Sequence, residues 1–209
     1  RKGIVTALGG LGPHADITAA LMTLAKKGDE SLQVEAEAAR SLGRLRAEGA
    51  VDICAEVAAR PSWGAMMSAR AIEGMSHTRD PAALPHLLSW SEADKPERAR
   101  AAAAAGLGRL ADQVESCRAE AIDRLVQLAK DGPFRVRYAA IPALGTARAT
   151  QAIGMLRRVH EGQGDGRLRR QSFEAIRRIR RGRSGESAVA GLRQDLDTMR
   201  EENRSLRSR

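Results

Sequence analysis

The sequence predicts an all-α fold built from repeated helix pairs. Alanine accounts for 38 of the 209 residues, and it has the highest helix propensity of the amino acids. Aromatic residues make up only 2% of the chain, whereas strands are enriched in aromatic and β-branched side chains. A short phrase also recurs along the chain at a nearly constant interval. Together these observations argue against an all-β fold and indicate a helical repeat array.

The recurring phrase is Ala-Leu-Gly, or a close variant, usually followed by another apolar residue. Its aliphatic anchor returns every 30 to 37 residues, at Leu8, Leu42, Ile72, Leu107, Leu144 and Ile176. In most copies a glycine follows the anchor, where it allows either a close helix approach or a turn. Glu73 stands in place of this glycine in the third copy, so we expect that repeat to be looser or shifted.

The first three copies show how each repeat is built. In the first, Gly12-Pro13 forms a turn and the second helix covers residues 17–24, where apolar residues fall at helical spacing. In the second, the two helices cover residues 34–45 and 51–57. The third copy carries Asp80-Pro81 at its turn. This pair favours the start of the next helix, because Asp can cap a helix and Pro fits the first helical position.

The later copies follow the same order. Helices are expected over residues 99–110 and 122–128, and the second of these ends at the Asp-Gly-Pro sequence of residues 131–133. The fifth copy begins at Val136 and has its second helix over residues 153–159. The sixth copy has only its first helix, over residues 167–180.

Three phrases resemble the HEAT-repeat family, and its PBS-lyase-like subclass in particular. They are VRYAAIPALG from Val136, DPAALPHLL from Asp80 and RLRRQSFEAIRRI from Arg167. The resemblance implies a right-handed α-solenoid of about five and a half stacked helix pairs over residues 1–183. In such an array no pair buries its apolar face alone, because neighbouring repeats supply the core.

A different pattern covers residues 184–209. Apolar positions and one Asn alternate at gaps of three and four, which is typical of a short coiled coil: Val189, Leu192, Leu196, Met199, Asn203 and Leu206. This seam predicts a homodimer formed through the tail, with Asn203 setting the register. The alternative is a single helix that frays or packs on a neighbour, because the seam spans fewer than three heptads.

The final helix and the tail together resemble the C-terminus of bacterial aminopeptidase N-like (gluzincin) zinc aminopeptidases. The phrases are GRLRRQSFEAIRRIRRG and LRQDLDTMREENRSLRSR. The resemblance implies that this chain is the C-terminal helical part of a larger enzyme. It would cover the catalytic domain or mediate assembly. The metal motif of that family, His-Glu-x-x-His, does not occur in this sequence, so no catalytic residue is carried over.

The sequence contains no recognisable arrangement of catalytic, metal-binding or cofactor-binding residues. Its four His residues are far apart, and its two Cys residues, Cys54 and Cys117, fit neither a zinc site nor a disulfide framework. We therefore predict no catalytic residue, no metal and no cofactor, and expect both cysteines to be small buried hydrophobes. No apolar run reaches the length of a membrane span, so no membrane partner is expected and a cytoplasmic location is favoured.

The net charge of +9 is concentrated near the end of the repeats. A candidate patch for anions or nucleic acid lies on the last repeat helix: Arg169, Arg170, Arg177, Arg180 and Arg181. A solvated face, or a contact with an acidic protein, explains the same residues. Nucleic acid is disfavoured because the chain has few aromatic side chains for stacking on bases.

The leading hypothesis is a non-catalytic protein–protein interaction or scaffold domain. The second helix of each pair is expected to line the concave face, where partner contacts would come from Asp16, Asp123, Arg124, Gln127, Arg157 and Arg158. The partner would be the catalytic domain of the same chain or another protein. Two alternatives stay open, a free-standing HEAT adaptor that dimerises through its tail and a basic solenoid that binds nucleic acid.

Overall fold

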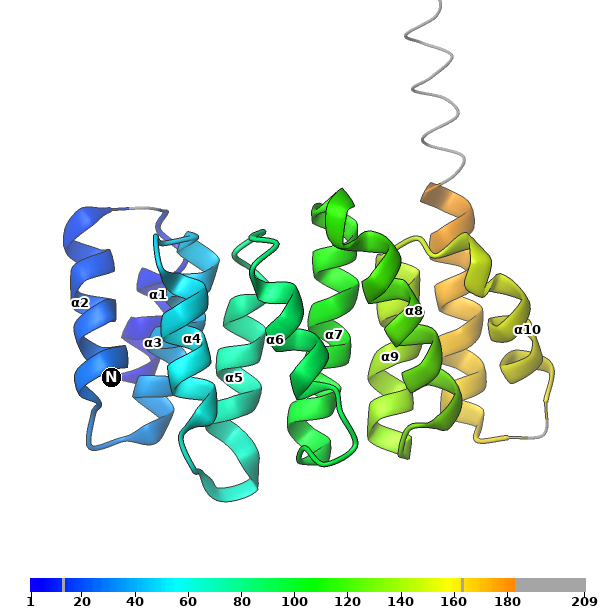
Figure 1. Ribbon diagram of the computed structural model, residues 1–209, viewed down its shortest axis with the longest axis horizontal. Coiled ribbons are helices and arrows are strands. Elements are labelled where there is room, and N and C mark those ends of the chain that lie inside the picture. Colours follow the sequence, from blue (N-terminus) through cyan, green and yellow to red (C-terminus); the bar gives the residue numbers. More distant parts are fainter. Residues whose placement is uncertain (13, 163, 183–209) are drawn as a thin grey trace, which may run out of the picture.

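The computed structural model describes residues 1–12, 14–162 and 164–182, and every regular element in these ranges is helical. Five helix pairs are followed by a single final helix over residues 166–182 (Figure 1). The first helices of the pairs are α1 (Lys2–Leu8), α3 (Leu32–Leu45), α5 (Met66–Met75), α7 (Glu97–Gln113) and α9 (Phe134–Thr146). The second helices are α2 (Ala15–Lys27), α4 (Ala50–Ala59), α6 (Ala83–Trp90), α8 (Glu115–Asp131) and α10 (Ile153–Glu161). Two 3-10 turns, η1 (Trp63–Ala65) and η2 (Thr150–Ala152), precede α5 and α10.

This arrangement confirms the predicted all-α solenoid. The first helices form one layer, in which α1 packs on α3, α3 on α5, α5 on α7 and α7 on α9. The second helices form the other layer and pack mainly on the first helices of their own and adjacent repeats. The predicted tail seam and the boundary at residue 183 lie outside the described residues.

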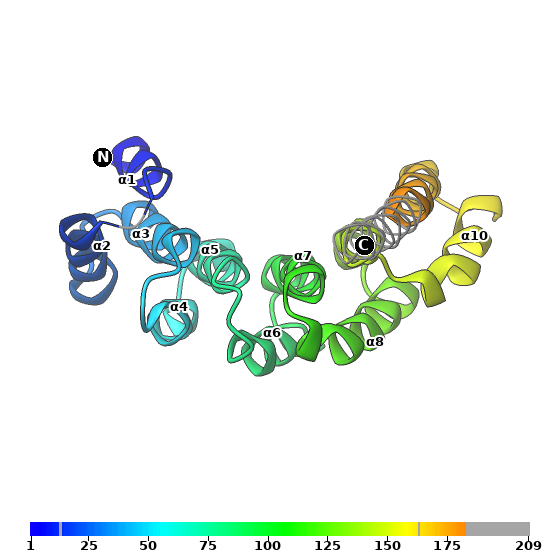
Figure 2. The same ribbon diagram turned by 90° about the horizontal axis from the view of Figure 1, so that it is seen from above.

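The two layers are bent into an arc, and the first helices line its concave side (Figure 2). The prediction that the second helices line the concave side was therefore wrong. Contacts within the layer of first helices are more extensive than those within the layer of second helices. Because the first helices lie closer together, the array curves toward them. We call this layer the inner layer and the layer of second helices the outer layer.

Glycines explain why the inner helices approach so closely. A Cβ added to Gly43 would lie 2.0 Å from the carbonyl oxygen of Gly74, so α3 and α5 meet backbone to backbone. A Cβ on Gly108 would lie 2.6 Å from the Cβ of Ala143 on α9. Gly145 makes the corresponding close contact with Ala175 of the final helix, where an added Cβ would be 2.9 Å from its Cα. The anchor glycines thus serve close helix approach.

The third repeat retains its glycine, one position later than in the other copies. Gly74 replaces the glycine that we expected at Glu73, and an added Cβ would lie 2.9 Å from the Cα of Arg40. Of the two expected outcomes, a looser or a shifted repeat, the structure shows the shift and not the looseness. The one-residue shift leaves the side chain of Glu73 only partly buried, and its carboxylate is within reach of Arg40 on α3.

The core consists of small and aliphatic side chains, chiefly Ala, Leu, Ile and Val. Cys54 and Cys117 are buried free thiols, as predicted. The Cys54 thiol lies 3.3 Å from the Ala39 carbonyl oxygen, and burial raises its pKa to about 12. The thiolate, which is the reactive form, is therefore disfavoured at this site.

Candidate functional site

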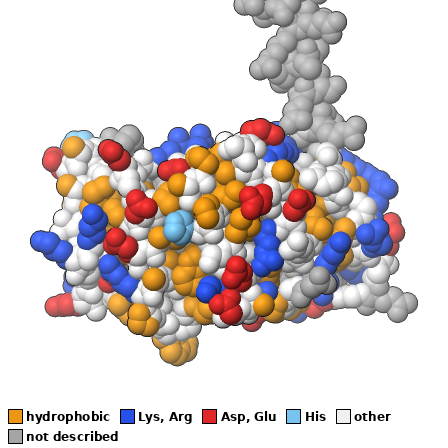
Figure 3. Space-filling view, in the orientation of Figure 1, with side chains coloured by type: hydrophobic (Ala, Val, Ile, Leu, Met, Phe, Trp, Pro, Cys, Tyr) orange, Lys and Arg blue, Asp and Glu red, His pale blue; other side chains and the backbone are white. Residues whose placement is uncertain are grey.

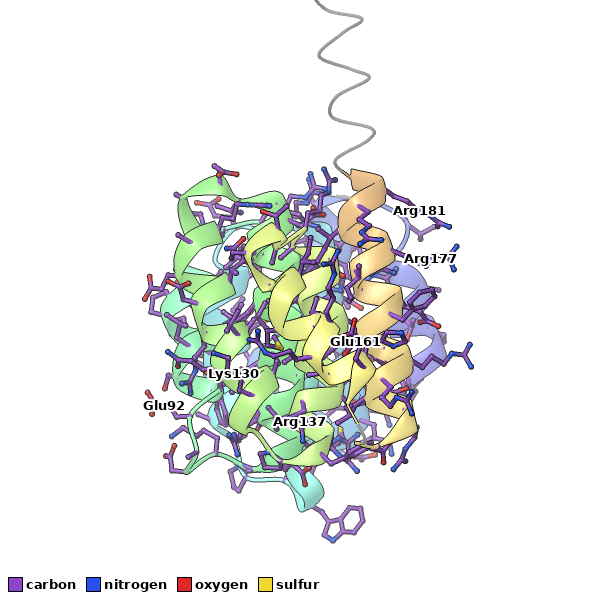
Figure 4. All side chains as sticks on the ribbon, turned by 90° about the vertical axis from the view of Figure 1, so that its right-hand side faces the viewer. Glu92, Lys130, Arg137, Glu161, Arg177 and Arg181 are labelled. Carbon is purple, nitrogen blue, oxygen red and sulfur yellow. The ribbon has the colours of Figure 1, made fainter. Side chains whose placement is uncertain are left out.

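Several arginines lie on the inner-layer helices, some exposed and some partly buried, and a few carboxylates lie among them. We define the inner arginine face by six of them: Arg40, Arg70, Arg98, Arg109, Arg177 and Arg181. The first four lie on α3, α5 and α7, and the other two lie on the final helix. Figure 4 shows Arg177 and Arg181 projecting from the side of the final helix opposite to Glu92 and Lys130, which belong to the outer side of the molecule.

A groove of about 360 Å³ lies between α5 and α7 on this face. Its α7 wall is formed by residues at helical spacing, with Arg98 and Arg109 at the two ends and Ala102 and Ala105 between them. Arg70 contributes to the α5 wall. The alanines are too short to fill the space between the helices. The groove is therefore open between three guanidinium groups.

A network of ion pairs borders this groove and joins three inner helices. The Arg40 guanidinium donates to Glu37 at 2.8 Å and pairs with Glu73 of α5 at 2.9 Å. Arg70 also pairs with Glu73, at 3.1 Å. Thr6 of α1 donates its hydroxyl to Glu37 at 3.0 Å. The side chain of Glu37 is only 2% exposed, so this carboxylate depends on Arg40 for its countercharge.

The two central members of the network have shifted pKa values. Burial opposes the charged form of Arg40, but hydrogen bonds to Glu37 and Glu73 outweigh it and raise the pKa of Arg40. Burial likewise opposes ionisation of Glu73, but Arg40 and Arg70 outweigh it and lower the pKa of Glu73. Both groups are therefore held in their charged forms.

Arg109 differs from Arg40, because no described carboxylate lies within ion-pair distance of it. Its guanidinium is partly buried and donates to the Ser76 hydroxyl. Burial lowers the pKa of Arg109, and the nearby positive charge of Arg40 lowers it further, while Glu73 acts in the opposite direction. An arginine does not lose its proton in proteins, so the groove carries positive charge that the described residues do not neutralise.

His77 gives this region a pH dependence. Burial, together with the positive charges of Arg109, Arg40 and Arg44, lowers the pKa of His77 to about 4, from an ordinary value of 6.5. Between these values the unfolded chain takes up a proton that the folded chain does not. The free energy of unfolding is therefore expected to fall, by about 2 kcal/mol, as the pH drops from 6.5 toward 4.

Urea unfolding at a series of pH values measures this loss. The variant H77Q is expected to remove most of the slope in that interval. The lowered pKa of Glu73 adds a further loss at lower pH, because its stabilising contribution is present above its ordinary pKa of 4.5 and disappears as the carboxylate takes up a proton in the folded state. Equal slopes for the wild type and H77Q would contradict the assignment to His77.

The structure divides the predicted arginine patch on the final helix into two stripes. Arg170, Arg177 and Arg181 fall on one stripe at helical spacing. Arg169 and Arg180 lie about 100° around the helix from it. Arg169 donates to the His160 carbonyl oxygen at 3.0 Å, so it holds the last turn of α10. The predicted patch of five is therefore not one surface.

Individual members of the first stripe also have contacts within the chain. Arg170 pairs with Glu174 at 3.0 Å, and both side chains are largely exposed. The Arg177 guanidinium lies 5.7 Å from the centre of the Phe173 ring. These contacts orient the cations without burying them, so they stay accessible to a large anionic partner.

The six predicted partner-binding residues lie on the outer layer. Asp16, Asp123, Gln127, Arg157 and Arg158 are exposed on α2, α8 and α10. Arg124 is partly buried, because its guanidinium donates to the Ser91 hydroxyl at 2.7 Å and to the Ser91 carbonyl oxygen at 3.1 Å. Figure 3 shows this outer surface, on which acidic, basic and apolar side chains are interspersed. The structure does not bring the six residues into one site.

Sequence reasoning missed Arg40, Arg70, Arg98 and Arg109. The available signal was the spacing of Arg98, Ala102, Ala105 and Arg109, which places all four on one side of a helix. That signal has meaning only once the first helices are known to line the concave side. The partnership of Arg40 with Glu73 crosses between repeats, and helical periodicity within one helix does not indicate it.

Two further properties bear on the kind of site. Among the described residues, no three His, Cys, Asp or Glu side chains come together in a way that could hold a metal ion. No helix in the part of the chain that the structure describes is long and apolar enough to cross a bilayer.

Comparisons with known proteins agree with the repeat architecture. The family model for HEAT repeats matches residues 18–108 and 84–177. A chain from the structure of the complex of CpcE and CpcF of phycocyanin lyase from Nostoc sp. PCC7120 has a similar fold, with a TM-score of 0.61 and 23% sequence identity. The alignment covers 78% of this chain and 99% of that one. No curated protein matches the sequence. Since the family match spans well over half of the residues, the chain belongs to the HEAT-repeat family.

Proposed function

We propose that this chain is a non-catalytic interaction module whose inner arginine face binds an acidic segment of a partner protein. The observation that carries the proposal is Arg109, a partly buried guanidinium with no carboxylate partner among the described residues. It lies in the α5–α7 groove together with Arg98, which is exposed and likewise has no ion-pair partner among the described residues. Two carboxylates of one acidic segment from outside the chain would satisfy them, one at each end of the groove, since the planar guanidinium pairs with carboxylates in a bidentate geometry.

An acidic protein fits this face better than nucleic acid does. Single-stranded nucleic acid is held by aromatic stacking, whereas the described lining of the groove is alanine, arginine and glutamate. The solved structure of similar fold is itself a complex of two proteins, which supports a role in assembly.

A charge reversal at Arg98 tests the proposal. The probe is fluorescein-labelled poly-L-glutamate of about twenty residues, measured by fluorescence anisotropy at about 150 mM salt. We expect R98E to weaken binding about tenfold, because it replaces an attractive charge in the groove with a repulsive one. The matched control R157E makes the same change of charge on the outer layer and is expected to weaken binding less than about twofold.

Two results would contradict the proposal. Equal weakening by R98E and R157E would show that only the net charge matters. A duplex DNA of about twenty base pairs that binds more tightly than polyglutamate at the same salt, and loses affinity with R98E, would favour the nucleic-acid alternative.

The narrower hypotheses depend on residues 183–209, which lie outside the described part of the chain. Neither the family match nor the similar structure supports the C-terminal part of a zinc aminopeptidase-like protein. The free-standing adaptor that dimerises through its tail also stays a prediction. The size of the native polypeptide in the source cell, with the zinc content of that polypeptide, distinguishes the two.

A further inference from the structure

A second cleft, which we call the C-terminal cleft, lies where α8, α9, α10 and the final helix meet. Its volume is about 620 Å³, within the range of ligand-binding clefts. The apolar part of its lining comes mainly from Phe134, Met155, Val159 and Leu168, one or two from each of three helices. The cleft is separate from the inner arginine face and shares no lining residue with the α5–α7 groove.

The cleft exists because α10 does not close over the end of α8. Helix α10 has 9 residues, whereas α8 has 17, and α10 makes few contacts with α8 or α9 (Figure 2). Gly162 and Gly164 follow α10 and present no side chain to fill the space. Phe134 at the edge of the cleft keeps 39% of its surface exposed, although Tyr138 stacks on its ring with the centroids 5.8 Å apart and the Arg167 guanidinium lies 4.3 Å from the ring centre.

The rim of the cleft is cationic. Lys130 of α8 and Arg158 of α10 line it, and neither has an ion-pair partner among the described residues. Arg137 of α9 also lines it and donates to the Ala129 carbonyl oxygen, so its charge is not neutralised by that bond. Asp165 brings one carboxylate to the rim, but Arg167 pairs with it at 3.0 Å. Figure 4 shows Lys130 and Arg137 on the side of the molecule where α8 and α10 face each other.

We propose that the C-terminal cleft binds a peptide segment in which one or two large apolar side chains are flanked by Asp or Glu. The apolar side chains would cover Phe134, Val159 and the other apolar residues, and the carboxylates would meet Lys130 and Arg158. Apolar burial supplies most of the affinity in such sites, and the flanking charges supply orientation and selectivity.

A second copy of this chain is the competing occupant. Trp63 is the most exposed large apolar side chain among the described residues, at 93%, but Arg60 precedes it and would bring positive charge against the positive rim. Leu11 is 71% exposed, and the nearest charged residue in the sequence is Asp16. Self-association of the chain that K130E/R158E abolishes would therefore assign the cleft to a second copy.

A display selection tests the proposal with peptides of unbiased sequence. A library of random peptides of about twelve residues is selected on the immobilised full chain. Enriched peptides are expected to combine Leu, Ile or Phe with adjacent Asp or Glu. For the best of them, K130E/R158E is expected to raise the dissociation constant at least tenfold, because two attractive charges become repulsive.

Two controls make the result specific. R157E reverses the neighbouring exposed charge on α10, outside the cleft, and is expected to change binding less than about twofold. R98E is expected to leave binding at the cleft unchanged, so the proposal for the cleft and the proposal for the inner arginine face are tested independently. Circular dichroism confirms that each variant keeps its helical content.

Several outcomes would overturn the proposal. They are the absence of enrichment, enrichment of basic or wholly polar peptides, or equal losses with K130E/R158E and R157E. Displacement of the selected peptide by decanoate at about 1 mM, with direct decanoate binding that K130E/R158E abolishes, would instead assign the cleft to an amphipathic small molecule.

Discussion

Replacing Gly43 with alanine is expected to lower the free energy of unfolding by about 3 kcal/mol or more. The new Cβ would lie 2.0 Å from the Gly74 carbonyl oxygen and 2.8 Å from its Cα. These are backbone atoms, which cannot rotate away, so α3 and α5 must separate. Separation would also loosen the ion pair between Arg40 and Glu73, which bridges the same two helices.

Gly154→Ala is the matched control. Gly154 is an exposed helical glycine of α10 with open space around it, so an added methyl group meets nothing. This variant is expected to be neutral or to stabilise the protein by up to about 1 kcal/mol, because alanine favours the helix. Urea unfolding of the two variants gives the comparison. A loss for Gly43→Ala no larger than the change for Gly154→Ala would show that the inner helices are not in backbone contact.

Arg40→Met is expected to cost about 3–5 kcal/mol, because it leaves a buried carboxylate without its cation. Glu37 is 2% exposed and would retain only the hydrogen bond from the Thr6 hydroxyl. Methionine fills most of the volume of the arginine stem, so the loss of stability would come from the unpaired carboxylate and not from an empty cavity. The double variant Glu37→Gln/Arg40→Met is expected to recover most of the stability, since the neutral amide can still accept from Thr6.

The matched control is Arg170→Met, which removes an exposed ion pair with Glu174 on the final helix. This change is expected to cost less than about 0.5 kcal/mol. The free energy of unfolding of these three variants, each compared with the wild type, forms the test. If Glu37→Gln adds a further loss to Arg40→Met instead of reversing it, the destabilisation does not come from the unpaired carboxylate.

The sequence alone was sufficient to predict the repeats, because their anchors recur at a regular interval. It was not sufficient to predict which layer is concave. Both helices of a pair have an apolar side, and periodicity does not reveal which layer has the shorter spacing. The glycines at positions 43, 108 and 145 did hold that information, since all three belong to first helices. Glycine permits a shorter distance between neighbouring helices, and the layer with the shorter distances forms the inner side of the arc.

The candidate site was harder to predict than the fold. The contact between Arg40 and Glu73 joins residues from adjacent repeats, and the sequence marks Glu73 only as a replacement for an anchor glycine, not as a partner of Arg40. The arginines of the final helix were recognised as a cluster, but the sequence did not show that Arg169 donates a hydrogen bond to the His160 carbonyl oxygen. Periodicity within a helix is local information, whereas these partnerships depend on the register between repeats.

The glycine contacts of the inner layer also affect the entropy of binding. Backbone contact between neighbouring helices leaves little freedom for one repeat to tilt against the next. The backbone positions of the arginines on helices joined in this way, such as Arg40 on α3 and Arg70 on α5, are therefore fixed relative to one another before a ligand arrives. A ligand that matches this spacing would still have to order exposed arginine side chains but not the helices that carry them, and such preorganisation of the backbone favours tighter and more selective association.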